Sequence, residues 1–297
     1  MLAKAPGLPA DEVFLDLEDS VAPAAKTQAR ENVVRALRAG GWDGKTVAVR
    51  VNAVATRWCY RDIIDVAAAA GQHLHCVMLP KVESASDITF VASLLRMVEE
   101  EHGLPHPIGI EAQIESAVAL RAVHEIATAS SRLETLIFGP GDMAASLGVP
   151  STTIGGASPH YPGDQWHWVL ESILVAARAA GLQAIDGPYG RIHDLDGFRA
   201  SALRSRSLGY DGKWVLHPGQ ITAANEVFTP GQAEFEHALA ILDAYSRAAG
   251  GQRGAVMFGS EMIDEASRKM AERLAASGRA AGLTGTGRGE SSEAGPG

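Results

Sequence analysis

Two carboxylates, Glu115 and Asp142, each stand close behind an apolar segment that has the pattern of a buried strand. They are 142 − 115 = 27 residues apart, about the length of one strand–helix unit. Because neighbouring parallel strands end at the same edge of a sheet, this spacing brings both carboxylates together. Two hard oxygen ligands with further positions left open suit Mg²⁺. The spacing is compatible with two interpretations. The two acids either bind a metal ion together, or each one only orients its own loop through hydrogen bonds.

Arg50 ends another apolar, β-branched segment and is the natural clamp for a substrate carboxylate. Its guanidinium offers a planar fork that matches two carboxylate oxygens. An internal salt bridge with Glu18 or Asp19 is the alternative, and one arginine can serve both purposes. We therefore predict Arg50 to be a substrate-binding and catalytic residue.

The segment from Gly139 to Ala144 matches the G-x-G-x-x-A pattern of dinucleotide-binding loops. That pattern should follow the first strand of a nucleotide-binding unit, whereas here it lies in the middle of the chain before a long polar loop. A tight turn that exposes backbone N–H groups to an anionic ligand atom fits better. We expect Gly139, Pro140 and Gly141 to contact the substrate.

Further polar residues are expected around this site. Lys4, Lys26 and Arg30 are cations near the first strand end, and they could hold the phosphates of an anionic cofactor. Lys26 and Arg30 are four residues apart on a predicted helix, so a solvated helix face stays open for them. Four residues at the ends of the first and last strands are expected to contact and orient the ligand-binding side chains without binding the ligand themselves. They are Asp16, Glu18, Asp19 and His217.

Charge and composition restrict the partners of this chain. Its 297 residues are 46% hydrophobic, as expected for a globular core, and carry a net charge of −9. Such an acidic chain is poorly suited to sequence-independent binding of nucleic acid or of an anionic membrane surface. No apolar run is long enough to cross a bilayer. Two cysteines are too few for a disulfide framework, which favours a reducing cytoplasm.

Seven strand–helix units alternate along the chain. The predicted strands have near-continuous apolar runs, typical of a parallel sheet covered on both faces, at residues 12–17, 46–51, 76–79, 108–114, 133–138, 183–185 and 213–216. Polar residues gather at their carboxyl ends, which converge at one mouth in a barrel but spread along an edge in an open sheet. We predict an α/β fold, a (β/α)8 TIM barrel, in residues 1–230. A further helix and a post-barrel segment follow in residues 231–276, and the Gly/Ser/Ala-rich residues 277–297 are expected to be disordered.

Several motifs resemble the citrate lyase β-subunit-like branch of the HpcH/HpaI aldolase superfamily. They are Asp16-Leu17-Glu18-Asp19-Ser20-Val21-Ala22-Pro23, Arg50-Val51-Asn52, Ile114-Glu115-Ser116, Phe138-Gly139-Pro140-Gly141-Asp142 and Gly212-Lys213-Trp214-Val215-Leu216-His217-Pro218. Four other segments look most like malyl-CoA/β-methylmalyl-CoA lyases: residues 56–62, 185–188, 225–230 and 262–264. The resemblance extends from about residue 3 to residue 276 in consistent order.

The resemblance implies a (β/α)8 barrel with Mg²⁺ (or Mn²⁺) held by Glu115 and Asp142, and with Arg50 binding the substrate. It implies coenzyme A across the barrel mouth and a C-terminal lid whose Asp264 acts as an acid in a neighbouring subunit's site. A homo-trimer or homo-hexamer is expected to exchange this lid. The family has a strand before the region that matches residues 1–8, and we expect this chain to lack it.

The implied reaction is reversible retro-Claisen cleavage of malyl-CoA or β-methylmalyl-CoA to glyoxylate and acetyl-CoA or propionyl-CoA. Three alternatives remain open within the superfamily. They are a citramalyl-CoA lyase, a malyl-CoA thioesterase, and a citrate lyase β-type subunit that needs partner chains. One methyl group of pocket size contributes only about 1–3 kcal/mol to discrimination, so the sequence does not select among the acyl groups.

Overall fold

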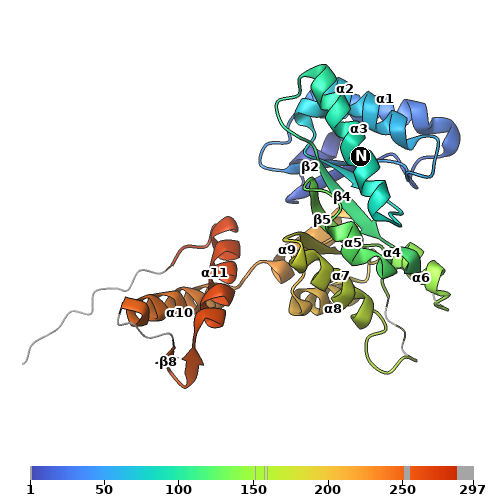
Figure 1. Cartoon of the computed structure of the whole chain (residues 1–297). Coiled ribbons are helices and arrows are strands. Elements are labelled where there is room, and N and C mark those ends of the chain that lie inside the picture. Colours follow the sequence, from blue (N-terminus) through green and yellow to red (C-terminus); the bar gives the residue numbers. More distant parts are fainter. Residues whose placement is uncertain (1, 151, 157, 159, 251–254, 286–297) are drawn as a thin grey trace, which may run out of the picture. The chain divides into compact units, whose positions relative to one another are not determined.

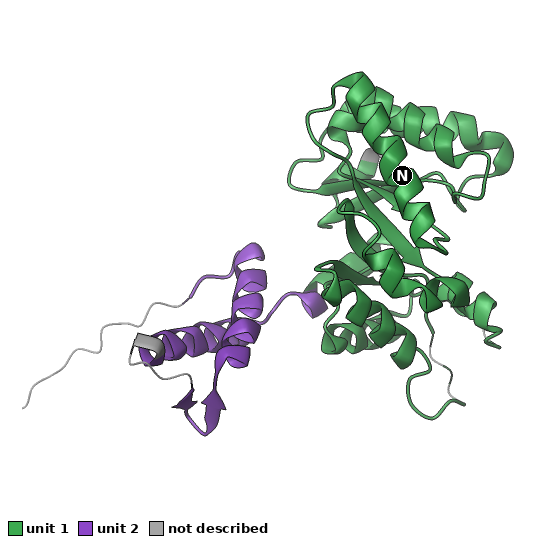
Figure 2. Ribbon diagram, in the orientation of Figure 1, with its two compact units in different colours: residues 1–225 green, residues 226–297 purple. Residues whose placement is uncertain are grey.

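The computed structural model describes residues 2–150, 152–156, 158, 160–250 and 255–285. The chain divides into two compact units, residues 1–225 and residues 226–297, which are coloured separately in Figure 2. The first unit holds a parallel sheet and its helices. The second holds two long helices and a small hairpin.

A seven-stranded parallel sheet forms the centre of the first unit, with its strands in chain order. The strands are β1 (Glu12–Asp16), β2 (Thr46–Arg50), β3 (Cys76–Leu79), β4 (Gly109–Ile114), β5 (Leu133–Phe138), β6 (Gln183–Asp186) and β7 (Gly212–Lys213). Every residue of β3 and β4 is buried, as the continuous apolar runs predicted. The seven predicted strands and their parallel arrangement are therefore confirmed.

The sheet curls (Figure 1). A side-chain contact between its two edge-strand regions shows how closely the edge strands approach each other. The Phe14 ring on β1 lies 4.7 Å from the Trp214 ring, which directly follows β7, with the two rings edge to face. Among the described residues no backbone ladder joins β1 to β7. The observed fold is thus a curled parallel sheet of the kind from which TIM barrels are built.

The last strand is shorter than the predicted residues 213–216. Trp214 still donates its N–H to Asp186 O at 2.9 Å, but the backbone then turns. Pro218 begins the short 3-10 helix η4 (Pro218–Gln220), and the side chain of His217 caps that helix. The strand ends early because proline and the cap redirect the chain.

Helices connect the strands and surround the curled sheet (Figure 1). They are α1 (Lys26–Ala39), α2 (Cys59–Ala70), α3 (Ala85–His102), α4 (Ala117–Arg121), α5 (Val123–Ala127), α6 (Pro140–Leu147), α7 (His167–Ala179), α8 (Leu195–Leu208) and α9 (Ile221–Phe228). Their boundaries have local causes. Ser84 starts α3 with a capping box and Gly103 ends it in the left-handed conformation.

Short 3-10 segments complete the first unit: η1 (Leu2–Gly7), η2 (Pro23–Ala25) and η3 (Gly71–His73). No helix in the described part of the chain has both the length and the apolar character to cross a membrane. The two cysteines, Cys59 and Cys76, are both buried free thiols.

The second unit contains α10 (Gln232–Gly250), the antiparallel strands β8 (Val256–Phe258) and β9 (Glu261–Ile263), and α11 (Glu265–Ala280). The hairpin is absent from the sequence prediction. The two helices pack through a small core that includes Phe235, Ala271 and Ala275.

Helix α11 corrects part of the predicted disorder in residues 277–297. Residues 277–280 are helical, and Leu283 packs against the core of the second unit. A Cβ atom on Gly278 would lie 2.3 Å from the Phe235 ring, so this glycine permits close helix packing. Of the small residues at this helix end, Gly278 is buried, whereas Ser277 and Ala280 are exposed. Residues 286–297 lie outside the described residues.

Candidate active site

The two carboxylates predicted as a metal pair stand beside each other at the carboxyl edge of the sheet. Glu115 directly follows β4, and Asp142 lies in the first turn of α6, just after β5. These strands are paired, with Ile114 opposite Phe138 at their ends. Gly139 donates its N–H to Ile114 O at 3.1 Å and so ties the two strand ends together.

Glu115 is a buried acid in an unfavourable electrostatic environment. Burial raises the pKa of its carboxyl to about 7, and the negative charge of Asp142 adds to this rise. One hydrogen bond opposes it, because the backbone N–H of Lys81 donates to Glu115 Oε1 at 2.6 Å. A cation between the two carboxylates would relieve the repulsion between them.

The free donor atoms fit a magnesium ion. In the described part of the chain no hydrogen bond reaches the carboxylate of Asp142, which is exposed. The described residues contain no group of three or more His, Cys, Asp or Glu side chains placed to hold a metal. A site with two protein carboxylates leaves the other positions to water and substrate oxygens, as is usual for Mg²⁺.

Gly139 allows this arrangement by having no side chain. A Cβ atom at this position would lie 2.4 Å from both the Cβ and the Oε2 atoms of Glu115. Pro140 then starts α6, so the N–H groups of Gly141 and Asp142 belong to the first helical turn and have no partner within the helix. The turn thus brings free backbone donors close to the carboxylate pair.

Arg50 is fixed by four side chains. Its Nε and Nη2 atoms donate to Asp16 at 2.7 and 2.6 Å, and Nη1 lies 3.4 Å from Glu18. The guanidinium lies 5.8 Å from the Phe14 ring centre and 5.1 Å from that of Trp214. Burial opposes ionisation of Asp16, but the hydrogen bonds and charge of Arg50 outweigh it and lower the pKa of Asp16.

The internal salt bridge left open by the sequence exists with Glu18, at 3.4 Å, but the closer partner is Asp16, at 2.6 Å, which was not predicted as a partner. Asp16 uses the Nε–Nη2 edge of the Arg50 guanidinium. The Nη1–Nη2 edge is the part that can still meet a ligand, since an arginine fork has two usable edges. Asp16 therefore orients Arg50 without occupying the Nη1–Nη2 edge of its guanidinium.

Lys81 is a polar strand-end residue for which the sequence indicated no specific role. It follows β3 and is the one non-glycine residue with positive φ, 51°, in the described part of the chain. Its ammonium contacts Glu18 and lies 3.3 Å from Asp19, while its N–H holds Glu115. Such conformations are concentrated at functional sites. The only signal in the sequence was a lysine after a strand-ending proline.

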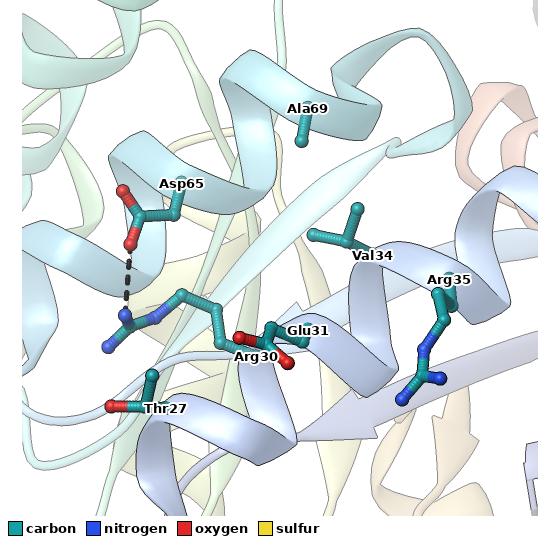
Figure 3. Close-up of a pocket in the computed structure, with 7 residues that line it drawn as sticks. All are labelled: Thr27, Arg30, Glu31, Val34, Arg35, Asp65 and Ala69. Carbon is teal, nitrogen blue, oxygen red and sulfur yellow. Dashed lines mark hydrogen bonds and ion pairs between the residues drawn. The ribbon is translucent and has the colours of Figure 1, made fainter.

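Two of the three predicted coenzyme A ligands have partners within the chain. Lys26 is buried, and its Nζ donates to Leu17 O and Glu18 O, both at 2.8 Å. Arg30 binds Asp62 at 3.0 Å. It also binds Asp65 at 2.9 Å (Figure 3). Lys4 is exposed in η1. Their part in coenzyme A binding stays a prediction.

Arg30 also lines a groove of about 490 Å³ between α1 and α2. The lining residues are Thr27, Arg30, Glu31, Val34, Arg35, Asp65 and Ala69 (Figure 3). The groove is on the helical side of the first unit and does not include the carboxylate pair.

His217 and Asp264 both serve as caps. His217 Nδ1 accepts the N–H of Gly219 at 3.1 Å at the start of η4. Asp264 caps α11 in the second unit, where it accepts N–H groups from Ala266 and Ser267 at 2.9 and 3.1 Å. The hydrogen bond from Ser267 leads the interactions that lower the pKa of Asp264. Any catalytic role of Asp264 stays a prediction.

Known proteins resemble this chain over most of its length. An L-malyl-CoA/β-methylmalyl-CoA lyase of Cereibacter sphaeroides (strain ATCC 17029 / ATH 2.4.9) is 41% identical over 89% of this chain and 86% of the relative. A (3S)-malyl-CoA thioesterase of Cereibacter sphaeroides (strain ATCC 17025 / ATH 2.4.3) is 35% identical over 89% of this chain and 85% of the relative. The solved structure of protein CitE from Mycobacterium tuberculosis, in complex with magnesium, acetoacetate and coenzyme A, is 30% identical. The match covers 93% of this chain and 92% of the CitE chain, with a TM-score of 0.72.

A family model also matches most of the chain. The model described as HpcH/HpaI aldolase/citrate lyase matches residues 1–218, which include all seven strands of the sheet and every mouth residue described above. The chain belongs to the HpcH/HpaI aldolase/citrate lyase family.

Proposed function

We propose that this protein is a Mg²⁺-dependent lyase that cleaves malyl-CoA or β-methylmalyl-CoA to glyoxylate and acetyl-CoA or propionyl-CoA. The observation that carries the proposal is the placement of Glu115 beside Asp142 at one edge of the sheet. The 41% identity to a malyl-CoA/β-methylmalyl-CoA lyase supports the choice of substrate.

The proposed architecture is a (β/α)8 barrel with the site at the carboxyl ends of its strands. Two observations support it. The seven strands follow one another in order around the curled sheet, and side chains of the first and last strand regions touch through Phe14 and Trp214. CitE shares the fold over nearly its full length.

Glu115 and Asp142 would hold the magnesium ion, and Mn²⁺ can take its place. When bound, the ion supplies a Lewis acid that lowers the pKa of the substrate hydroxyl. Arg50, fixed by Asp16, would bind the substrate through its Nη1–Nη2 edge, where Nη1 lies 3.4 Å from Glu18 and Nη2 keeps one N–H beyond its hydrogen bond to Asp16. Gly139, Pro140 and Gly141 place the free N–H groups of their turn beside the substrate.

The chemistry is a retro-Claisen step. The hydroxyl passes its proton to water, the bond between the hydroxyl carbon and the carbon next to the thioester breaks, and its electron pair forms the thioester enolate. Arg50 and the backbone N–H groups of the turn stabilise the enolate oxygen. Asp264 of a neighbouring subunit, after taking up a proton from water, delivers it to the enolate carbon and completes acetyl-CoA or propionyl-CoA. This role makes Asp264 part of a lid in a homo-trimer or homo-hexamer.

Supporting roles go to the other mouth residues. Asp16 orients Arg50, and Glu18 lies between the cations of Arg50 and Lys81. Asp19 contacts Lys81, and His217 holds the turn after β7. We propose that Lys4, Lys26 and Arg30 lie along the coenzyme A path, with Lys4 the exposed cation among them.

A malyl-CoA thioesterase is the second candidate, favoured by the 35% identity to a (3S)-malyl-CoA thioesterase. In that reaction water attacks the thioester, and the products are malate and free coenzyme A. A citramalyl-CoA lyase and a citrate lyase β-type subunit are further alternatives.

Product analysis separates these functions. Purified protein is incubated with Mg²⁺ and, separately, malyl-CoA, β-methylmalyl-CoA and citramalyl-CoA, and products are identified by mass. We expect glyoxylate with acetyl-CoA or propionyl-CoA from the first two substrates. Free coenzyme A with malate and no glyoxylate would identify a thioesterase. No cleavage of any free CoA ester would favour a subunit that needs partner chains.

A further inference from the structure

A buried ion pair lies behind the mouth, between the ends of β6 and β7. Lys213 Nζ and Asp186 Oδ2 are 2.6 Å apart, and each side chain is only 1% exposed. Helix α8 packs over the pair, with Arg204 Nη2 at 3.9 Å from Asp186 and the Phe198 ring 5.8 Å from the ammonium. The proposed reaction uses neither residue, so this desolvated pair needs another explanation.

The ion pair holds the peptide groups on both sides of Gly187. The Lys213 ammonium donates a second hydrogen bond, to Gly187 O at 2.7 Å. The Gly187 N–H donates to Asp186 Oδ1 at 2.8 Å. Because one side chain holds the N–H and the other holds the carbonyl, the backbone at Gly187 has little freedom to shift.

Gly187 in turn rests against the segment that carries Asp142. A Cβ atom on Gly187 would lie 2.2 Å from Phe138 O and 2.2 Å from Pro140 Cδ. Those two residues flank Gly139, whose own missing side chain makes room for Glu115. Direct contacts therefore run from Lys213 through Gly187 to the turn between Glu115 and Asp142.

We propose that Lys213, Asp186 and Gly187 are positioning residues that press the Gly139–Asp142 turn against Glu115 and so set the separation of the two metal-binding carboxylates. This inference rests on the proposed function, in which Glu115 and Asp142 bind the ion. Partners that orient metal ligands change metal affinity by about 10–100-fold when they are mutated.

Gly187→Ala tests the contact most directly. The φ angle of Gly187 is outside the left-handed region, so alanine fits the backbone and only the close contacts change. We expect the dissociation constant for Mn²⁺, measured by calorimetry or electron paramagnetic resonance without substrate, to rise about tenfold or more. Catalytic activity should recover at saturating Mg²⁺, while the Mg²⁺ concentration for half-maximal activity rises.

Lys213→Arg is the second variant, in case Gly187→Ala unfolds. It keeps the positive charge, but a planar guanidinium cannot place its donors as the compact ammonium does between Asp186 and Gly187 O. We expect the same direction of change in Mn²⁺ affinity. Gly7→Ala is the matched control, because nothing lies within 4 Å of the added Cβ atom, and it should bind Mn²⁺ like the parent protein.

The controls separate failure of this inference from failure of the proposed function. If the parent protein does not bind Mn²⁺, or if Asp142→Asn binds it equally well, the metal assignment itself is wrong. If Asp142→Asn loses Mn²⁺ while folded Gly187→Ala and Lys213→Arg bind it with the parent affinity, the positioning role is overturned. A lower thermal midpoint with unchanged Mn²⁺ affinity has the same meaning, because it shows a structural role alone.

Discussion

Arg50 illustrates how single side chains prepare this site. Asp16 takes one edge of the guanidinium, and two aromatic rings flank it. Long charged side chains lose considerable rotamer entropy when a ligand fixes them. Because Asp16 and the rings have already fixed Arg50, that loss does not recur when substrate binds.

Asp16→Asn should weaken this fixation. Asparagine can accept only one of the two hydrogen bonds from Arg50 and carries no charge to pair with it. We expect kcat/KM for malyl-CoA to fall about tenfold or more, in line with a lost charge-assisted hydrogen bond of about 1.5–3 kcal/mol.

Steady-state kinetics at saturating Mg²⁺ check this prediction. Asp43→Asn, at an exposed position away from the mouth, is the control for loss of one negative charge. Equal kcat/KM in Asp16→Asn and the parent protein would contradict a positioning role for Asp16.

The sequence could predict the locations of Glu115, Asp142 and Arg50 because strand ends follow from local hydrophobic patterns. It named Glu18 as a possible partner of Arg50, but it could not predict the aromatic neighbours of that residue. Phe14 and Trp214 meet only because the sheet curls until β1 approaches β7. The left-handed backbone of Lys81 was equally hidden, since lysine has no preference for that conformation.

At the scale of elements, the turn between β5 and α6 is the most constrained part of the site. Gly139 lies against Glu115, and Pro140 lies against Gly187. The G-x-G pattern therefore reflects close backbone packing. The first glycine, Gly139, leaves space for the carboxylate of Glu115, whereas the glycines of a dinucleotide-binding loop serve a tight turn and the approach to a pyrophosphate.

Gly139→Ala should disable the site. The added Cβ atom would lie 2.4 Å from Glu115 Oε2, so either the carboxylate or the turn must move. We expect kcat/KM to fall about 100-fold, since small displacements of catalytic groups have effects of that size. Kinetics with a Mg²⁺ titration measure it.

Gly141→Ala, two residues later, is the internal comparison for that experiment. Its Cβ atom would meet only Ile154, at 3.7 Å, which is an ordinary contact. Its effect should be much smaller than that of Gly139→Ala. Similar losses in the two variants would show that the whole turn, rather than the contact with Glu115, is sensitive.

Element prediction succeeded where periodicity was long and failed where tertiary contacts decide. Helix α8 (Leu195–Leu208) has boundaries with local signals in the sequence, because Asp194 caps its start and Gly209 follows its end. The hairpin of β8 and β9 was missed because each strand has only three residues. The end of α11 was missed because Gly278 reads as a helix breaker until Phe235 is seen against it.

At the scale of the whole molecule, acidic groups face each other across the amino-terminal end of the sheet. Glu111 on β4 is 3% exposed and interacts with Glu12 on β1 and Glu134 on β5. Burial raises its pKa well above the ordinary value, and the charges of both neighbours add to the rise. The Cys76 thiol on β3 donates to Glu134 on β5, at 3.5 Å.

This cluster should make stability depend on pH. A group whose pKa is raised by folding stabilises the protein below its unfolded value, and that stabilisation is lost as the pH rises through the folded value. Glu111→Gln removes the titration and keeps a similar shape. We expect its thermal midpoint at about pH 8 to exceed that of the parent protein by about 2–4 °C for each kcal/mol gained.

The difference between the two proteins should shrink as the pH falls towards about pH 5, because the raised pKa of Glu111 favours its neutral form on acidification. Glu101→Gln, at an exposed position on α3, is the control and should follow the parent protein at both pH values. A thermal midpoint of Glu111→Gln that stays below that of the parent protein at alkaline pH would contradict the assignment.

The central claim concerns the two carboxylates and the bond that breaks, and one measurement tests both. Glyoxylate release from malyl-CoA is followed over a Mg²⁺ titration in the parent protein and in Asp142→Asn. We predict Mg²⁺-dependent release by the parent protein, and a loss of about 100-fold or more in the variant at sub-saturating Mg²⁺. Glyoxylate release by Asp142→Asn equal to that of the parent protein at the same Mg²⁺ concentration would contradict the account.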